Sequence, residues 1–276
     1  MGRILTIAQL TFLEARRRKI VPAVLGCGGL FLLVYGIALH FVAARLAADG
    51  APLLQRQAVL QIITLAGLYV ANFLTIAVAV LLPVDTLSGE IASGVMQTLA
   101  SKPLNRAEIV LGKWLAFLGM SAAYFAFTAG GVLLILRVIA GHVQPHMAVA
   151  LPLLLLGSAL MLSISMAGGA RLSTVSNAII AFAFYGIAFI GGWIEQIGTM
   201  TAAASARNIG TMISLVSPID ALWRRAAVEM SPGLTGLQFS PFGASNVPSN
   251  AMIVWAVGFT ALAVALAVGS FRRRPL

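Results

Sequence analysis

Charged residues are scarce in this chain. Only 9% of its 276 residues are Asp, Glu, Lys or Arg, and 60% are hydrophobic. An average soluble protein is about 25% charged, and a soluble core of this size could not bury so many apolar side chains. The composition therefore excludes an ordinary soluble domain and predicts a protein that crosses a membrane several times.

Cysteine and acidic residues are scarce as well. Cys27 is the only cysteine, which excludes an intrachain disulfide and a cysteine metal site. Eight acidic residues stand against eighteen basic ones, and this net charge of +10 would suggest nucleic-acid binding in a soluble protein. Here the basic residues stand at the ends of hydrophobic runs, which favours membrane topology and lipid-headgroup contact and argues against nucleic acid.

Six runs of the sequence hold no Asp, Glu, Lys or Arg and are long enough to cross a bilayer. A helix needs about 20 residues for this, since it rises about 1.5 Å per residue across about 30 Å of hydrocarbon. The first run is longer than the core of a secretory signal, so we expect it to be retained as a span. We predict an all-α, single-domain membrane protein with spans at 20–42, 62–82, 114–136, 148–167, 176–194 and 251–270.

The basic residues indicate the orientation. Cytoplasmic loops of membrane proteins carry an excess of Lys and Arg. With both termini inside, 12 of the 18 basic residues are cytoplasmic. These are Arg3, Arg16, Arg17, Arg18, Lys19, Lys102, Arg106, Lys113, Arg171, Arg272, Arg273 and Arg274.

The segments at 1–19 and 195–250 are predicted to lie outside the bilayer core. In the first, apolar residues share one side of a helix, which is typical of an interfacial helix on the cytoplasmic surface. The second is predicted to be an extracytoplasmic loop with one short amphipathic helix, which begins after Ser217-Pro218. The alternative is that residues 195–227 dip into the membrane as a re-entrant piece.

The polar stretch at 85–113 separates the second and third runs. Asp85 is expected to cap an amphipathic helix at 86–100, with an apolar stripe that ends at Leu99. Lys102-Pro103 should end that helix. Asn105 and Glu108 form a capping-box pattern, which predicts the start of the next helix.

This stretch also carries a family resemblance. Its motifs are Asp85, Ser88-Gly89-Glu90, the turn Lys102-Pro103-Leu104-Asn105-Arg106, and Leu111-Gly112-Lys113. Their order resembles the signature between the second and third spans of type-2 ATP-binding-cassette (ABC) exporter permeases. The resemblance is greatest to the branch that includes the permease of the nitrous-oxide-reductase maturation exporter.

The resemblance implies a bacterial inner-membrane protein that works with partners. Two ATPase subunits would dock on the stretch at 85–113, ATP and magnesium would bind to those subunits, and a second permease chain, identical or homologous, would complete the pathway. No cofactor is implied on this chain itself. The implied coupling residues are Asp85, Ser88, Gly89, Glu90, Leu99, Lys102, Pro103, Arg106 and Lys113. A solvated surface charge is the competing interpretation of Glu90, and an inside anchor that of Arg106 and Lys113.

Catalytic and ion-coupling motifs are missing. Gly112-Lys113 is not part of a phosphate-binding loop, because Ala107 stands where a glycine is needed and Trp114 replaces the Ser or Thr. The chain is therefore not expected to be an enzyme. Ion-coupled transporters usually place an ionisable residue within the bilayer, and the six runs have none. An external energy source is the simpler prediction.

Polar residues within the runs are candidates for a transport pathway. Hydrogen bonds between helices are the competing interpretation for such residues. The candidates are Asn72, Thr75, Ser163, Asn177 and Tyr185. His142 and His146 are four residues apart, but Pro145 stands between them and no carboxylate is near in sequence, so we predict no metal site.

The sequence thus predicts the permease subunit of an ABC transporter, an exporter driven by separate ATPase subunits and in contact with membrane lipid. Two alternatives stay open. One is a secondary transporter or channel. The other is a permease-like subunit that passes mechanical force to an extracytoplasmic protein through residues 195–250.

Overall fold

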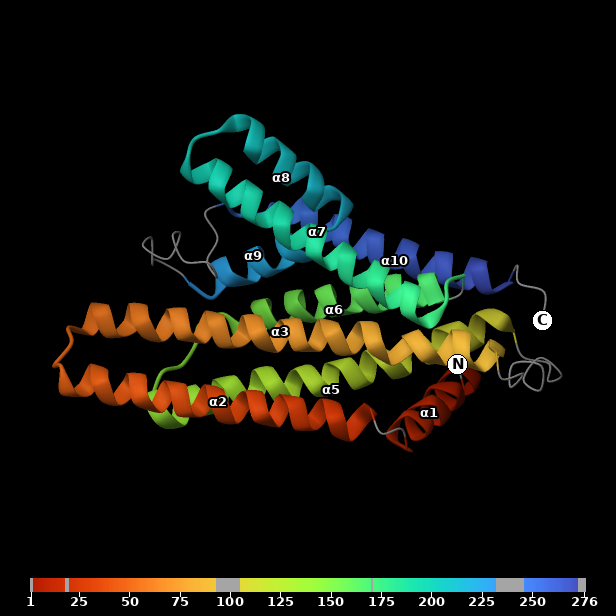
Figure 1. Ribbon diagram of the computed structural model, residues 1–276, viewed down its shortest axis with the longest axis horizontal. Coiled ribbons are helices and arrows are strands. Elements are labelled where there is room, and N and C mark those ends of the chain that lie inside the picture. The colour runs from red at the N-terminus through yellow and green to blue at the C-terminus, as the bar shows by residue number, and fades with distance from the viewer. Residues whose placement is uncertain (1, 18–19, 93–104, 170, 232–245, 273–276) are drawn as a thin grey trace.

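The computed structural model describes residues 2–17, 20–92, 105–169, 171–231 and 246–272. All regular structure within these ranges is helical (Figure 1). The helices are α1 (Gly2–Arg17), α2 (Ile20–Ala48), α3 (Leu53–Ala92), α5 (Arg106–Ala140), α6 (Met147–Gly169), α7 (Thr174–Met200), α8 (Ala204–Val216), α9 (Ile219–Glu229) and α10 (Asn250–Arg272).

Six of these helices are long and apolar enough to cross a membrane, as predicted. They are α2, α3, α5, α6, α7 and α10, and each contains one of the six uncharged runs. Each helix extends beyond its uncharged run. Polar residues at a helix end can continue the backbone hydrogen bonding of the helix outside the apolar zone of the membrane. The chain is therefore indicated to be a multi-pass membrane protein.

Both chain ends lie at the same end of this bundle (Figure 1). We call it the terminal end; α3 and α6 finish there, and α5 and α7 begin there. The opposite end, where α2 connects to α3 and α5 connects to α6, is called the far end. Residues 85–92 and 105–113, on the two sides of the polar stretch, therefore belong to the terminal end.

The predicted helix break at Asp85 is wrong, because α3 continues through Pro83 and Asp85 to Ala92. Proline disturbs the hydrogen bonding of the preceding turn. A neighbouring helix compensates for this: the Ser165 hydroxyl of α6 donates to the Val80 carbonyl at 2.8 Å. Such hydrogen bonds are how spanning helices tolerate an internal proline.

The predicted start of the third spanning helix is confirmed. Asn105 is the N-cap residue of α5, with extended backbone angles. Its backbone N–H donates to Oε2 of Glu108 at 3.3 Å, which is one half of the capping box. At the other end Gly141 adopts φ 62° and closes the helix with its N–H on the Arg137 carbonyl.

The first helix, predicted at 1–19, is confirmed as α1. Thr11 and Ala15 are buried on the side that packs against α5, whereas Leu10 and Leu13 are exposed. Gly112 of α5 allows a close approach, since a Cβ at this position would lie 2.8 Å from the Ile7 side chain and 3.0 Å from the Ile4 carbonyl oxygen. The helix therefore crosses the outside of α5 near the terminal end.

The central helix of the bundle is α6, which is buried along most of its length. It contacts α3, α5, α7, α9 and α10. The main hydrophobic cluster joins Leu160 and Met161 of α6 to Leu65 and Leu68 of α3, and to Trp223 of α9. The fold is organised around this helix.

The segment at 195–250 differs from its prediction. Helix α7 continues to Met200, α8 returns alongside it, and α9 turns back toward the far end (Figure 1). The predicted short helix exists as α9, but its apolar side is in the main core with α3 and α6 and not on a membrane surface. Helix α9 thus packs inside the helix bundle, and α8 lies against α7. Most of the predicted Pro- and Gly-rich loop, residues 232–245, lies outside the described residues.

Candidate functional site

The predicted coupling residues divide between two helices and a segment outside the described residues. Asp85, Ser88, Gly89 and Glu90 belong to the last turns of α3, and Arg106 is the first residue of α5. Leu99, Lys102 and Pro103 lie outside the described residues. The structure thus brings the two ends of the polar stretch at 85–113 to the terminal end of the bundle.

Lys113 is buried, whereas a lysine that anchors a helix at the membrane surface would be exposed. Its residue is only 4% exposed, two turns into α5 and next to Gly112, where α1 packs. A lysine is rarely so buried unless it has a partner, and Lys113 does take part in an interaction. Lys113 is therefore a buried lysine on α5, one residue after the glycine against which α1 packs.

Three of the predicted pathway residues make hydrogen bonds in the bundle interior. The Thr75 hydroxyl donates to the Ala71 carbonyl of its own helix at 2.8 Å. Ser163 accepts from the Trp114 indole of α5 at 2.9 Å. Asn177 donates to the Ser165 carbonyl of α6 at 2.8 Å. The geometry of Ser163 and Asn177 is that of polar contacts between helices.

Asn72 and Tyr185 are brought together around a small void. This void of about 10 Å³ lies between α3, α7 and α9, and Asp220 also lines it. Asn72 is 5% exposed, and its carbonyl oxygen Oδ1 has no hydrogen-bond partner in the described part of the chain. The sequence had named two of these residues but not Asp220.

Asp220 belongs to a buried charged cluster that we call the α7–α9 cluster: Glu195, Ser214, Asp220, Arg224 and Asn246. Arg224 Nη2 lies 2.9 Å from Glu195 Oε2, and each of these side chains is 5% exposed. Arg224 Nε lies 2.9 Å from Asp220 Oδ2, close enough for an ion pair although off the axis of a good hydrogen bond. One guanidinium therefore neutralises carboxylates from two helices.

Neutral side chains complete this cluster. Asn246 donates through Nδ2 to Glu195 Oε1 at 2.7 Å. The Ser214 hydroxyl of α8 accepts from Arg224 Nη2 at 3.1 Å and donates to Glu195 Oε2 at 3.5 Å. Four segments, α7, α8, α9 and the approach to α10, are thus joined through Glu195 and Arg224.

Glycines make room for the cluster. A Cβ on Gly192 would overlap the Asp220 carboxylate, and a Cβ on Gly210 would overlap the backbone and Cβ of Glu195. Gly191 similarly admits the Ile213 side chain. Side chains of α8 and α9 thus fill the space beside Gly191 and Gly192.

Helix α9 begins about halfway along the bundle. The Ser217 hydroxyl, just before α9, donates to the Phe184 carbonyl in the middle of α7 at 3.4 Å. Trp223 stacks edge-on against Tyr69 in the middle of α3, with ring centroids 4.8 Å apart. The other end of α9 reaches the far end, where Gln61 and Gln144 donate to the Met230 carbonyl at 2.9 and 2.6 Å.

No known family model matches the chain, and no curated protein matches it. The site is therefore characterised by its own geometry.

The six uncharged runs contain no Asp, Glu, Lys or Arg, but the α7–α9 cluster adds buried charge to the bundle. Two carboxylates against one guanidinium leave a net charge of −1 when all three groups are ionised. Burial raises the pKa of Asp220 to about 6, although its pairing with Arg224 lowers it and Glu195 raises it. Ionisable groups therefore do lie inside the bundle, although none lies in the six uncharged runs.

A local signal for the cluster was present in the sequence. Asp220 and Arg224 are four residues apart, the spacing of an ion pair along one helix face. Their pairing with Glu195, more than twenty residues away, is a tertiary contact with no local pattern. Local sequence predicts an outer loop for these charges, because no uncharged run of spanning length surrounds them.

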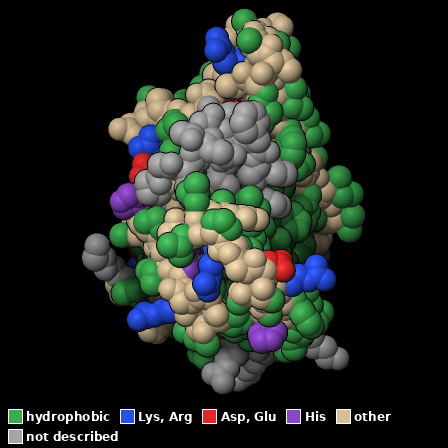
Figure 2. All heavy atoms as spheres, turned by 90° about the vertical axis from the view of Figure 1, so that its left-hand side faces the viewer, with side chains coloured by type: hydrophobic (Ala, Val, Ile, Leu, Met, Phe, Trp, Pro, Cys, Tyr) green, Lys and Arg blue, Asp and Glu red, His purple; other side chains and the backbone are tan. Residues whose placement is uncertain are grey.

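Among the described residues, the far end carries no single charged patch. Figure 2 looks onto this end and shows basic and histidine side chains scattered among hydrophobic ones. His146 donates through Nδ1 to the Glu229 carbonyl at 3.0 Å, which ties α6 to the end of α9. Among the described residues, no three His, Cys, Asp or Glu side chains come together as a metal site.

Proposed function

We propose that this chain is the permease subunit of an ABC exporter in the inner membrane of a bacterium, with both termini in the cytoplasm. The observation that carries the proposal is the order of the motifs at Asp85, 88–90, 102–106 and 111–113. The helix arrangement supports it, because α3 and α5 bring the two sides of this stretch to the end where both termini lie.

The proposed mechanism is mechanical. ATP and magnesium bind to two separate ATPase subunits, which close on ATP binding and move the coupling stretch. Residues 85–92 are continuous with the span of α3, so a displacement there acts on the whole helix. Helix α5, clamped by α1 at Gly112, moves with it, and the pathway between two permease chains opens by a rigid-body change.

Two substitutions test the coupling. Glu90→Ala and Leu99→Asp should reduce co-purification of the ATPase subunits or transport-linked ATP hydrolysis, while membrane insertion is unchanged. Asp49→Ala is the matched control, because this exposed carboxylate follows α2 at the far end. Wild-type assembly and turnover in both coupling variants would count against the proposal.

An ion-coupled secondary transporter is the second candidate. The observation that favours it is the α7–α9 cluster, whose buried carboxylates give the bundle the ionisable groups that its uncharged runs lack. Transport in proteoliposomes distinguishes the two. Transport that stops when the ATPase is inactivated supports the ABC permease, and transport that persists under an ion gradient supports the second candidate.

A further inference from the structure

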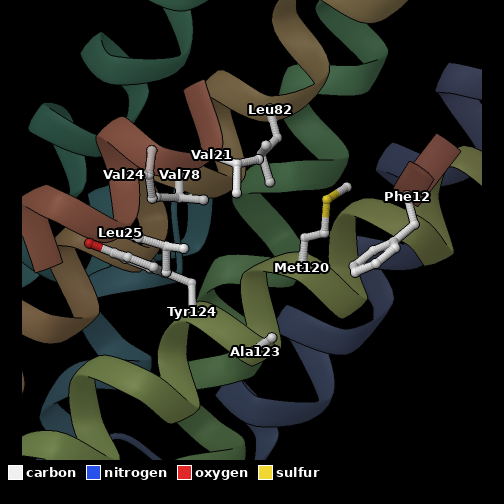
Figure 3. Close-up of a pocket in the computed structure, with 9 residues that line it drawn as sticks. All are labelled: Phe12, Val21, Val24, Leu25, Val78, Leu82, Met120, Ala123 and Tyr124. Atoms are coloured by element: carbon white, nitrogen blue, oxygen red, sulfur yellow. The ribbon is translucent and has the colours of Figure 1, made fainter. Parts of the chain in front are cut away.

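An apolar cavity of about 240 Å³ lies between α1, α2, α3 and α5 (Figure 3). Val78 and Tyr124 are buried at its floor, whereas Phe12 and Leu25 are nearly half exposed at its edge. Figure 3 shows the Phe12 ring reaching from α1 toward Met120 of α5. The cavity is thus open to the surroundings between α1 and α2.

Water is a poor occupant of this cavity. Buried water needs two to four polar partners, and every lining side chain except the Tyr124 phenol is wholly apolar. An empty cavity would deprive its lining atoms of dispersion contacts. The lining therefore favours a flexible hydrocarbon chain.

The position of the cavity indicates where such a chain comes from. Val21 is the first residue of the α2 span, and Leu82 is the last but one of the α3 span. The cavity thus lies near the terminal end, at the depth where lipid acyl chains begin. The α2 span is the least buried of the six within this chain, so the described helices leave the open side of the cavity uncovered.

Charge at this position favours an anionic lipid. Helix α1 ends with Arg16 and Arg17, a few residues before Val21 of the cavity. Basic residues next to a membrane surface attract anionic headgroups at about 1 kcal/mol each. A phospholipid with one acyl chain in the cavity would hold its headgroup close to the end of α1.

We propose that this cavity binds one acyl chain of an anionic phospholipid, with the headgroup near the C-terminal end of α1. The occupant would contact α1, α2, α3 and α5 at once and would fill the gap that they leave. This site is separate from the coupling stretch and from the α7–α9 cluster. It does not depend on the proposed transport function.

Native mass spectrometry of the detergent-purified chain tests the site. Ala123→Phe fills the cavity, and Phe12→Ala removes its edge. Both should lose the phospholipid that the wild-type chain retains. The matched controls are Ala126→Phe and Leu13→Ala, because both residues are exposed on the same helices but do not line the cavity. They should retain the lipid.

An add-back experiment completes the test. Phosphatidylglycerol should raise the unfolding temperature of the wild-type chain and both controls more than phosphatidylcholine does, and this difference should disappear in Ala123→Phe and Phe12→Ala. Equal lipid retention by cavity and control variants overturns the proposal. So does a loss of self-association in the cavity variants without loss of lipid, because a second copy of the chain would then be the occupant.

Discussion

At the residue scale, the α7–α9 cluster depends on Arg224. Its guanidinium lies 2.9 Å from Glu195 and 2.9 Å from Asp220. Burying a charged group is costly unless it is paired and hydrogen-bonded. Removal of the single cation leaves two carboxylates in the interior without compensation.

Arg224→Met should therefore destabilise the fold by roughly 3–5 kcal/mol, the cost of breaking a buried ion pair from one side. The neighbouring Arg225→Met is the matched control. Arg225 pairs with Glu229 at 2.8 Å, but its side chain is 23% exposed, so its loss should cost about 1 kcal/mol or less. Thermal unfolding in detergent measures both. Equal losses of stability in the two variants would show that the buried Arg224 ion pairs contribute no more than the partly exposed Arg225–Glu229 pair.

The pH dependence of stability should reflect Asp220. Burial raises its pKa from 3.8 to about 6, so the folded chain binds this proton more tightly than the unfolded chain does. The contribution of this group to the free energy of unfolding is therefore full at low pH and is lost as pH rises through about 6. From about pH 5 to about pH 7, the wild-type chain should lose about 1 kcal/mol relative to Asp220→Asn. Parallel pH profiles for the two proteins would contradict this.

At the element scale, the six spanning helices could be predicted because the absence of charge is a property of each run by itself. The continuation of α3 as one helix past Asp85 could not be predicted in this way. The polar residues from Asp85 onward indicate a new helix locally, whereas the hydrogen bond that supports the turn before Pro83 comes from Ser165, on another helix. The capping box at Asn105 was predictable because both of its members are local.

The path of α8 and α9 was also beyond local patterns. Their charged residues are typical of an outer loop, and only the tertiary contacts of Glu195 and the glycines facing α8 and α9 place them in the bundle. The same reason explains the predicted pathway residues. Asn72 and Tyr185 line one void together with Asp220 of α9, and this is a tertiary contact that no local pattern predicts.

Gly192→Ala tests this packing. A Cβ at Gly192 would overlap the Asp220 carboxylate, so α9 must move away from α7. We expect a loss of roughly 1–3 kcal/mol, as for other overpacked positions. Gly186→Ala is the control on the same helix, because a Cβ there meets nothing within 4 Å, and it should be neutral or stabilising by up to about 1 kcal/mol. Thermal unfolding again measures the difference.

At the scale of the whole molecule, the pair α8–α9 divides the bundle into two halves. Toward the far end, α9 and the α7–α9 cluster fill the space beside α6 and bring ionic groups into the interior. Toward the terminal end, α3, α5 and α1 form a continuous assembly that leads to the coupling stretch. Under the proposed function, movement enters through the second half, and the cluster holds the first half rigid.

Cysteine labelling tests this arrangement in the membrane. In a Cys27→Ala background, a cysteine at Ser205, near the start of α8, should react with a membrane-impermeant maleimide from outside intact spheroplasts. One at Ser173, which precedes α7 at the terminal end, should react only after lysis. Met212 is 68% exposed in the isolated chain, but α8 carries it toward the middle of the bundle, so Met212→Cys should stay unlabelled until the membrane is dissolved in detergent. Labelling of Met212→Cys in intact spheroplasts would mean that α8 lies in water, and the bundle would then have a surface hairpin in place of a re-entrant one.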